Sequence, residues 1–136
     1  MKLKNPQQQT LEYLENSTRP PLPADGVTNL VKTCHALRKK PIGQFTIEDL
    51  RIMIGQEIGL DYLIPVALEK LMENLFAEGH YYEGDLLENV LNVNTTFWDD
   101  NKALWQQLNA LIKDSREEII RAKFDTTKFD NCKHAV

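Results

Sequence analysis

The sequence predicts an all-α fold: a single-domain, compact bundle of about six to seven helices with a long C-terminal helix. Apolar residues recur at intervals of three and four along most of the chain, the spacing of a helix with one buried face. No stretch alternates apolar and polar residues between hairpin turns, so no strand is required. A length of 136 residues is enough for one hydrophobic core but not for two.

Residues 1–25 are expected to form a peripheral arm. Asn5 and Pro6 are typical of a helix start, and the apolar residues up to Asn16 predict a short first helix. Three prolines follow in STRPPLPAD, residues 17–25, and prolines cannot continue a helix. A short proline cluster is more often a stiff linker than a ligand for a proline-binding domain, so we expect a linker.

The core is expected over residues 26–124 and begins with a helix that Asp25 or Thr28 can cap. Pro41 ends this helix, and the preceding basic run lies where the helix dipole favours cations, which argues against a phosphate-binding patch. The predicted buried face of the helix consists of Val27, Leu30, Val31, Cys34 and Leu37.

Two central helices are predicted within TIEDLRIMIGQEIGLDYLIPVAL, residues 46–68. Thr46 is a good N-cap, and Glu48 and Asp49 place negative charge beside the positive end of the helix dipole. Gly59 is expected to end the first helix in a left-handed conformation, and Pro65 suits the first turn of the next helix. The predicted buried face of the first helix consists of Ile47, Leu50, Ile54 and Ile58.

The last third of the chain is expected to hold a short helix, an aromatic plug and the longest helix. Asp85 can cap the short helix, and Phe97 with Trp98 is expected to fill the core. The longest helix is expected to run from Asp99 or Asp100 to about Phe124. Residues 125–136, DTTKFDNCKHAV, have no periodicity and are expected to fray.

Charge is unevenly distributed along the chain, whose net charge is −4. Residues 1–40 carry seven Lys or Arg against three acids, residues 41–101 two against twelve, and residues 102–136 seven against five. Helix capping and solvation account for part of the acidic residues. Because so acidic a middle segment repels phosphates and attracts cations, we expect a basic protein partner and no nucleic acid.

Several classes of site and location are disfavoured. The N-terminus has no signal-peptide pattern and no segment is apolar enough to span a bilayer, so we expect a cytoplasmic protein with no membrane partner. Cys34 and Cys132 offer no disulfide framework and are expected to be free thiols. With His35 and His134 they lack the spacing of a zinc site, and no nucleotide-binding glycine motif exists, so we expect no metal and no cofactor.

The most unusual stretch is FAEGHYYEGD, residues 76–85, where two glycines frame two tyrosines among acidic residues. Tyrosines are favoured at binding hot spots and carboxylates select a basic partner, although one tyrosine could instead pack inward. A hydrolase using His80 with a neighbouring carboxylate is conceivable, but no nucleophile lies near it in sequence, so we expect no enzyme. The candidate binding residues are Glu78, His80, Tyr81, Tyr82, Glu83, Asp85 and Glu88.

Most of residues 27–98 resembles the small helical immunity proteins of bacterial contact-dependent growth inhibition (CDI) systems. Leu75 and Glu83 stand where that family commonly has proline, and the N-terminal arm and the long C-terminal helix lie outside the resemblance. The segments that carry it, in this order and spacing, are LVKTCHALRKKPIG (30–43), TIEDLRIMIGQEIGLDYLIPVALEKL (46–71), AEGHYYEGDLLENVL (77–91) and the Phe97–Trp98 pair.

The resemblance implies a monomeric antidote that binds the C-terminal toxin domain of a cognate CDI effector in a 1:1 complex. It implies a toxin that is a nuclease, with an RNase as the first expectation, whose basic cleft the acidic, tyrosine-containing surface would occlude. A helical adaptor for another basic protein would have the same fold and charge. Helix-turn-helix DNA binding is set aside because the helix after Gly59 offers only Lys70 against two acids.

Overall fold

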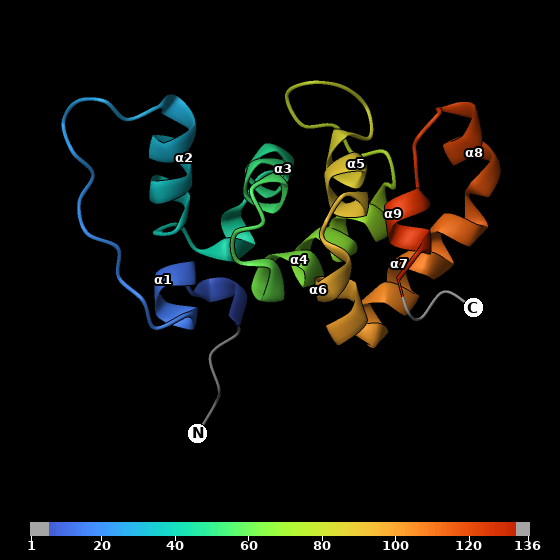
Figure 1. The fold of residues 1–136 in the computed structure, drawn as a ribbon, viewed down its shortest axis with the longest axis horizontal. Helices are drawn as coiled ribbons and strands as arrows, with labels where there is room; N and C mark the ends of the chain where they lie inside the picture. Colours follow the sequence, from blue (N-terminus) through green and yellow to red (C-terminus); the bar gives the residue numbers. More distant parts are fainter. Residues whose placement is uncertain (1–5, 133–136) are drawn as a thin grey trace.

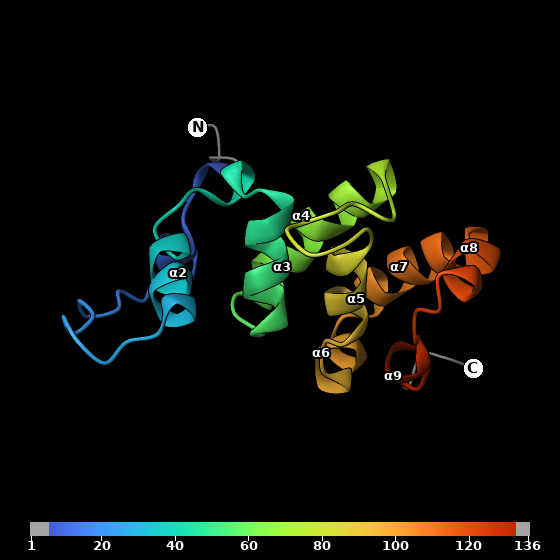
Figure 2. The ribbon, with the colours of Figure 1, turned by 90° about the horizontal axis from the view of Figure 1, so that it is seen from above.

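A computed structural model of the chain describes residues 6–132, and residues 1–5 and 133–136, with the expected cap Asn5 and with His134, lie outside the described part. The helices follow one another along the long axis nearly in chain order (Figures 1 and 2). Within residues 6–132 they are the 3-10 helices Pro6–Gln8 and Ile42–Gln44 and the α-helices α1 (Leu11–Leu14), α2 (Asn29–Leu37), α3 (Ile47–Gly55), α4 (Leu60–Glu73), α5 (Asp85–Leu91), α6 (Thr95–Asp100), α7 (Lys102–Asp114), α8 (Arg116–Arg121) and α9 (Thr127–Asp130).

The all-α prediction is confirmed, since residues 6–132 contain helices and no strand. Residues 6–132 contain more helices than the six to seven that the sequence predicts, for two reasons. The expected long helix is divided at Ser115 into α7 and α8, and a short helix, α9, forms in the tail. No helix within residues 6–132 is long and apolar enough to cross a membrane.

The predicted start of α3 is confirmed. The Thr46 hydroxyl accepts a hydrogen bond from the Asp49 backbone N–H at 3.1 Å, and the Asp49 carboxylate accepts one from the Thr46 N–H at 3.0 Å. This reciprocal capping box satisfies two backbone donors that the first helical turn leaves free. Lys40 also contacts the Asp49 carboxylate at 2.7 Å, so the cap joins α3 to the chain after α2.

The corner between α3 and α4 lies a few residues earlier than predicted. Gly59 has the predicted left-handed backbone (φ +66°), but α3 already ends at Gly55 and α4 begins at Leu60. Pro65 therefore lies inside α4 and not in its first turn, where the sequence placed it. A Cβ atom at position 59 would lie 2.8 Å from both methyl groups of Leu11, so the corner also needs glycine for close packing.

The hydrophobic core extends beyond residues 26–124 at both ends. Leu11 is fully buried, and the Glu12 N–H donates to the Arg38 carbonyl at 3.1 Å, so α1 packs on the bundle and is not peripheral. The predicted buried face of α2 is only half right. Cys34 and Leu37 are buried, whereas Leu30 and Val31 are 44% and 47% exposed.

The tail is folded where fraying was expected. Phe129 in α9 is fully buried. The centre of its ring lies 5.1 Å from that of Trp98, in an edge-to-face contact, and 5.3 Å from that of Trp105, in a stacked contact. The Trp105 indole N–H donates to the Phe129 carbonyl at 3.1 Å. Phe97 and Trp98 are buried as predicted. One aromatic residue without helical periodicity around it therefore fixes the tail up to Cys132, which is a buried free thiol like Cys34.

Candidate functional site

The candidate site is built on the connection between α4 and α5, residues 74–84, which we call the α4–α5 loop (Figure 1). Its own backbone closes it: the Gly84 N–H donates to the Phe76 carbonyl at 3.0 Å, and the Ala77 N–H donates to the Asn74 carbonyl at 3.1 Å. The side chain of Asn74 accepts from the Phe76 N–H at 3.1 Å. The two ends of the loop are thus held together beside the start of α5.

Asp85, the first residue of α5, holds the loop from below. Its Oδ1 accepts a hydrogen bond from the Gly79 N–H at 2.6 Å, and its Oδ2 accepts one from the Tyr81 N–H at 3.1 Å. Asp85 is only 1% exposed. The sequence suggested Asp85 as a contact residue. In the structure it lies beneath the loop, and its carboxylate accepts hydrogen bonds from the loop backbone.

Glu48 of α3 supplies a second buried carboxylate, which the sequence analysis credited only with a helix-dipole role. Its carboxylate accepts a hydrogen bond from the His80 backbone N–H at 2.9 Å. It also accepts one from Arg51 Nε at 2.7 Å and one from Arg51 Nη2 at 2.5 Å. The hydrogen bond from Arg51 is the main reason that the pKa of Glu48 is lowered. Because 32 residues separate Glu48 from His80, no local pattern could have revealed this contact.

Gly79 lets both carboxylates reach the loop backbone. A Cβ atom at this position would lie 2.6 Å from Glu48 Oε1 and 3.0 Å from Asp85 Oδ2. Contacts this short are repulsive, so any larger residue would displace at least one carboxylate from its backbone partners. Glycine is therefore required at position 79 because the two carboxylates approach the backbone so closely.

The loop turns its chemically distinctive side chains outward. Tyr81 is 68% and Tyr82 45% exposed, so the alternative that one tyrosine packs inward is wrong. The guanidinium carbon of Arg51 lies 4.4 Å from the centre of the Tyr81 ring, a cation–π contact that supports the ring from one side. His80 has a side chain 76% exposed, with its Nδ1 3.8 Å from Glu48 Oε2, and Glu78 and Glu83 are exposed as well.

Tyr82 is fixed by Glu88 in the first turns of α5. The Tyr82 hydroxyl donates to Glu88 Oε2 at 2.5 Å, and this bond is the main reason that the pKa of Tyr82 is raised to about 12. The carboxylate stabilises the protonated phenol because a phenolate could not donate this hydrogen bond. Tyr82 therefore presents a neutral, oriented ring to solvent.

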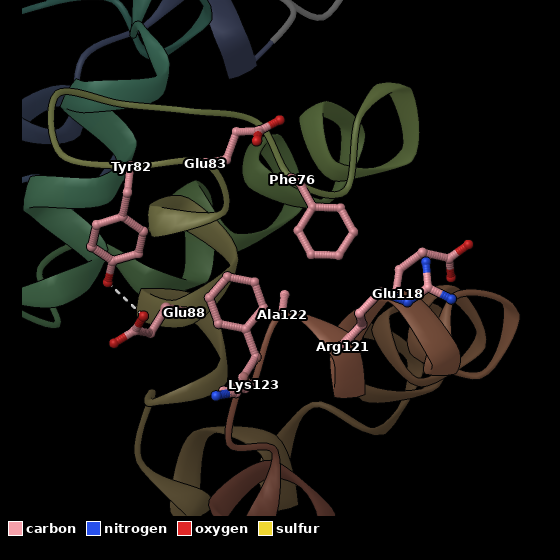
Figure 3. Close-up of a pocket in the computed structure, with 9 residues that line it drawn as sticks. Phe76, Tyr82, Glu83, Glu88, Glu118, Arg121, Ala122 and Lys123 are labelled. Atoms are coloured by element: carbon pink, nitrogen blue, oxygen red, sulfur yellow. Dashed lines mark hydrogen bonds between the residues drawn. The ribbon is translucent and has the colours of Figure 1, made fainter.

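A groove separates the loop from α8, and we call it the loop–α8 groove (Figure 3). The ring of Phe76 stacks on that of Phe124 with centres 5.8 Å apart, which ties the loop to the end of α8. Residues 116–124 are distant from the loop in sequence and have the spacing of one helix face, so the sequence does not indicate this half of the candidate site. The groove is lined by Phe76, Tyr82, Glu83, Glu88, Glu118, Arg121, Ala122, Lys123 and Phe124.

The candidate residues thus fall into two groups. Six of the seven lie at the outer surface or at the groove, and Asp85 lies below them with Glu48 and Arg51. Within residues 6–132, no group of three or more His, Cys, Asp or Glu residues is arranged to hold a metal ion. The arrangement offers exposed aromatic area and free carboxylates on a fixed backbone, which is suited to binding a protein surface.

Comparison with known proteins identifies a related family. A family model described as CDI immunity proteins matches residues 13–108, which include α3, α4, the α4–α5 loop and α5. The wall of the loop–α8 groove that α8 supplies lies after the matched residues. No curated protein and no solved structure matches the chain.

Proposed function

Since this chain belongs to the family of CDI immunity proteins, which neutralise CDI toxins, we propose that it covers the basic active-site cleft of its cognate toxin domain with the α4–α5 loop. The observation that supports this most is the anchored loop itself. Buried carboxylates hold its backbone while both tyrosines remain exposed. A surface ordered before binding loses little entropy when a partner arrives.

We assign the toxin to the nucleases, and among them to the RNases. Residues 41–101, which contain the loop, carry two Lys or Arg against twelve acidic residues. A nuclease cleft is basic because its substrate is a polyanion, so an acidic surface can occupy the cleft in place of phosphates. The proposed complex has one copy of each chain.

The proposed contact set is centred on Tyr81 and Tyr82. Aromatic residues with few rotatable bonds provide most of the binding energy in many interfaces, while rim charges mainly change the association rate and its salt dependence. Glu78, His80 and Glu83 surround the tyrosines on the exposed side of the loop. In this proposal Asp85 positions the loop and makes no contact with the toxin.

A titration against the toxin domain encoded immediately upstream tests the contact set. Tyr82→Ala is expected to weaken binding by about 2–4 kcal/mol, and Glu83→Lys to slow association with a changed salt dependence. Tyr13→Ala is the matched aromatic control, because Tyr13 is 67% exposed on α1, and Asp25→Lys is the matched charge control. Unchanged affinity in both loop variants would move the binding site elsewhere.

Growth rescue separates the proposed function from an adaptor. Cells that express the upstream-encoded toxin should grow when the chain is present, whereas an adaptor for another basic protein would leave them inhibited. A hydrolase using His80 is not supported, because an imidazole that is 76% exposed lacks the water-excluding surroundings that catalysis needs.

A further inference from the structure

We propose that the loop–α8 groove binds an arginine side chain that projects from the partner. This inference rests on the proposed function, because it names one chemical group that the toxin domain would present. The groove lies beside the α4–α5 loop and shares Tyr82 and Glu83 with the proposed contact set. It therefore offers a pocket directly beside the proposed contact set.

The aromatic rings of the groove suit a guanidinium plane. Phe76 and Phe124 stack with ring planes 18° apart, and both are only partly buried. The hydroxyl of Tyr82 is already bonded to Glu88, so Tyr82 offers its ring and not its hydroxyl. A guanidinium is planar and weakly hydrated, and it stacks on aromatic faces more readily than an ammonium does.

Two free carboxylates can complete the contact. Glu83 on the loop and Glu118 on α8 line the groove from opposite walls, and neither side chain has a hydrogen-bond or ion-pair partner among residues 6–132. Figure 3 shows the Phe76 ring between them. An arginine that stacks on the rings could donate to both carboxylates, and such charge-assisted bonds are about twice as strong as neutral ones.

The groove lining also contains two cationic side chains, Arg121 and Lys123, and the end of α8 accounts for their presence. Arg121 is the last residue of α8 and Lys123 follows it closely, so the negative end of the helix dipole favours both. In Figure 3 the Lys123 side chain points away from Phe76 and Glu83. Three carboxylates against two cations leave the groove negative, as the acidic segment beside it is.

The two walls are fixed to each other. Gly84 has a left-handed backbone (φ +87°), and a Cβ atom there would overlap the Phe124 ring, so ring and loop are in direct contact. The loop wall lies inside the residues that match the family and the α8 wall lies after them. The α8 wall is thus the part of the groove in which this chain can adjust recognition without altering the shared loop.

The test is an NMR titration of the full ¹⁵N-labelled chain with N-acetyl-arginine amide, which needs no toxin. The backbone amides of Phe76, Glu83 and Phe124 are expected to shift. Glu118→Lys should weaken the affinity by about tenfold or more. Glu117→Lys, the same charge change one residue away and outside the groove lining, should leave the affinity within about twofold.

Each outcome decides the question. Absence of shifts at the groove, or equal effects of the two lysine variants, would overturn the inference. Shifts with N-acetyl-glutamate amide in place of the arginine probe would assign the groove to an acidic group and would also overturn it. Growth rescue is measured separately: wild type without rescue counts against the proposed function, whereas rescue with an unresponsive groove counts against this inference alone.

Discussion

The α4–α5 loop and the proline-rich segment before α2, residues 17–28, are both irregular and both lie beside exposed apolar side chains. They differ in what holds their backbones. Two buried carboxylates from α3 and α5 accept hydrogen bonds from the loop, whereas no hydrogen bond within residues 6–132 engages residues 18–27. Tyr82 and Val31 are almost equally exposed, at 45% and 47%. Exposure alone therefore does not distinguish the two segments. They differ because buried carboxylates hold the loop backbone and exposed acidic side chains surround its tyrosines.

The largest expected effect comes from removing an anchor of the loop. Asp85→Ala leaves the partly buried backbone donors of Gly79 and Tyr81 without their acceptor, and we expect the free energy of unfolding to fall by about 3–4 kcal/mol. Urea unfolding measures this value. Glu83→Ala, an exposed acid two residues away, is the control and should cost less than about 0.5 kcal/mol. Equal losses in both variants would contradict the anchoring role.

Two glycines with nearly the same left-handed φ angle allow the two regions to be compared. Gly84 and Gly26 have φ of +87° and +81°, but a Cβ atom meets Phe124 at position 84 and nothing within 4 Å at position 26. Gly26→Ala should cost about 1 kcal/mol from the left-handed backbone, and Gly84→Ala about 2–3 kcal/mol more because of the clash. Thermal unfolding of both variants provides the comparison, and a similar loss at both positions would show that packing against α8 is unimportant.

The ion pair beneath the loop makes stability depend on pH. The pKa of Glu48 is lowered, chiefly by Arg51, below its ordinary value of 4.5, so its contribution is present above that pH and is lost as the pH falls further. Glu48→Gln should lower the free energy of unfolding by about 1–2 kcal/mol at pH 7. The difference between wild type and variant should shrink as urea unfolding is repeated below pH 4.5. A difference that stays constant with pH would exclude this origin.

A substitution beside the proline-rich segment should have little effect on stability or on toxin binding. Val31→Ser alters a side chain that is 47% exposed, so we expect a change of less than about 1 kcal/mol in unfolding and none in toxin affinity. Isothermal titration with the toxin domain, run beside Tyr82→Ala, makes the comparison direct. A loss of affinity in Val31→Ser similar to that in Tyr82→Ala would give the two regions equal importance.

The smallest effect concerns the phenol of Tyr82. Its pKa is raised to about 12 by the hydrogen bond to Glu88, so the stability that this bond provides is complete below the ordinary value of 10.0 and is lost as the pH rises through about 12. The difference in phenolate absorbance between wild type and Tyr82→Phe isolates this group from the other tyrosines. Glu88→Gln should move the transition toward 10.0, and an unmoved transition would point to another cause.

Local signals predicted much of the fold, because caps and periodicity are written into neighbouring residues. The capping box of Thr46, the left-handed Gly59 and the buried Trp98 follow from such signals. Tertiary contacts decided the rest. Phe129 folds the tail because two tryptophans from other helices receive it, and nothing around it in sequence indicates this.

The exposed residues of the candidate site could be predicted from the sequence, but the contacts that hold them in place could not. The tyrosines and acids of the loop stand out in the sequence, and the structure exposes most of them. Glu48, Asp85 and the α8 wall obtain their roles from partners that are distant in sequence or hidden beneath the surface. A carboxylate that binds backbone amides and one that faces solvent look the same in a list of residues, so the sequence did not show that Asp85 is buried beneath the loop.

The aromatic cluster around Phe129 has a practical use in spectroscopy. The chain has two tryptophans, Trp98 and Trp105, and both rings contact this one phenylalanine. Intrinsic fluorescence therefore reports on the docking of α9 and gives little signal from the α4–α5 loop. A change in emission on mixing with a toxin would mean that binding is transmitted to the C-terminal end of the bundle, while silent emission would mean that the complex forms with that end unchanged.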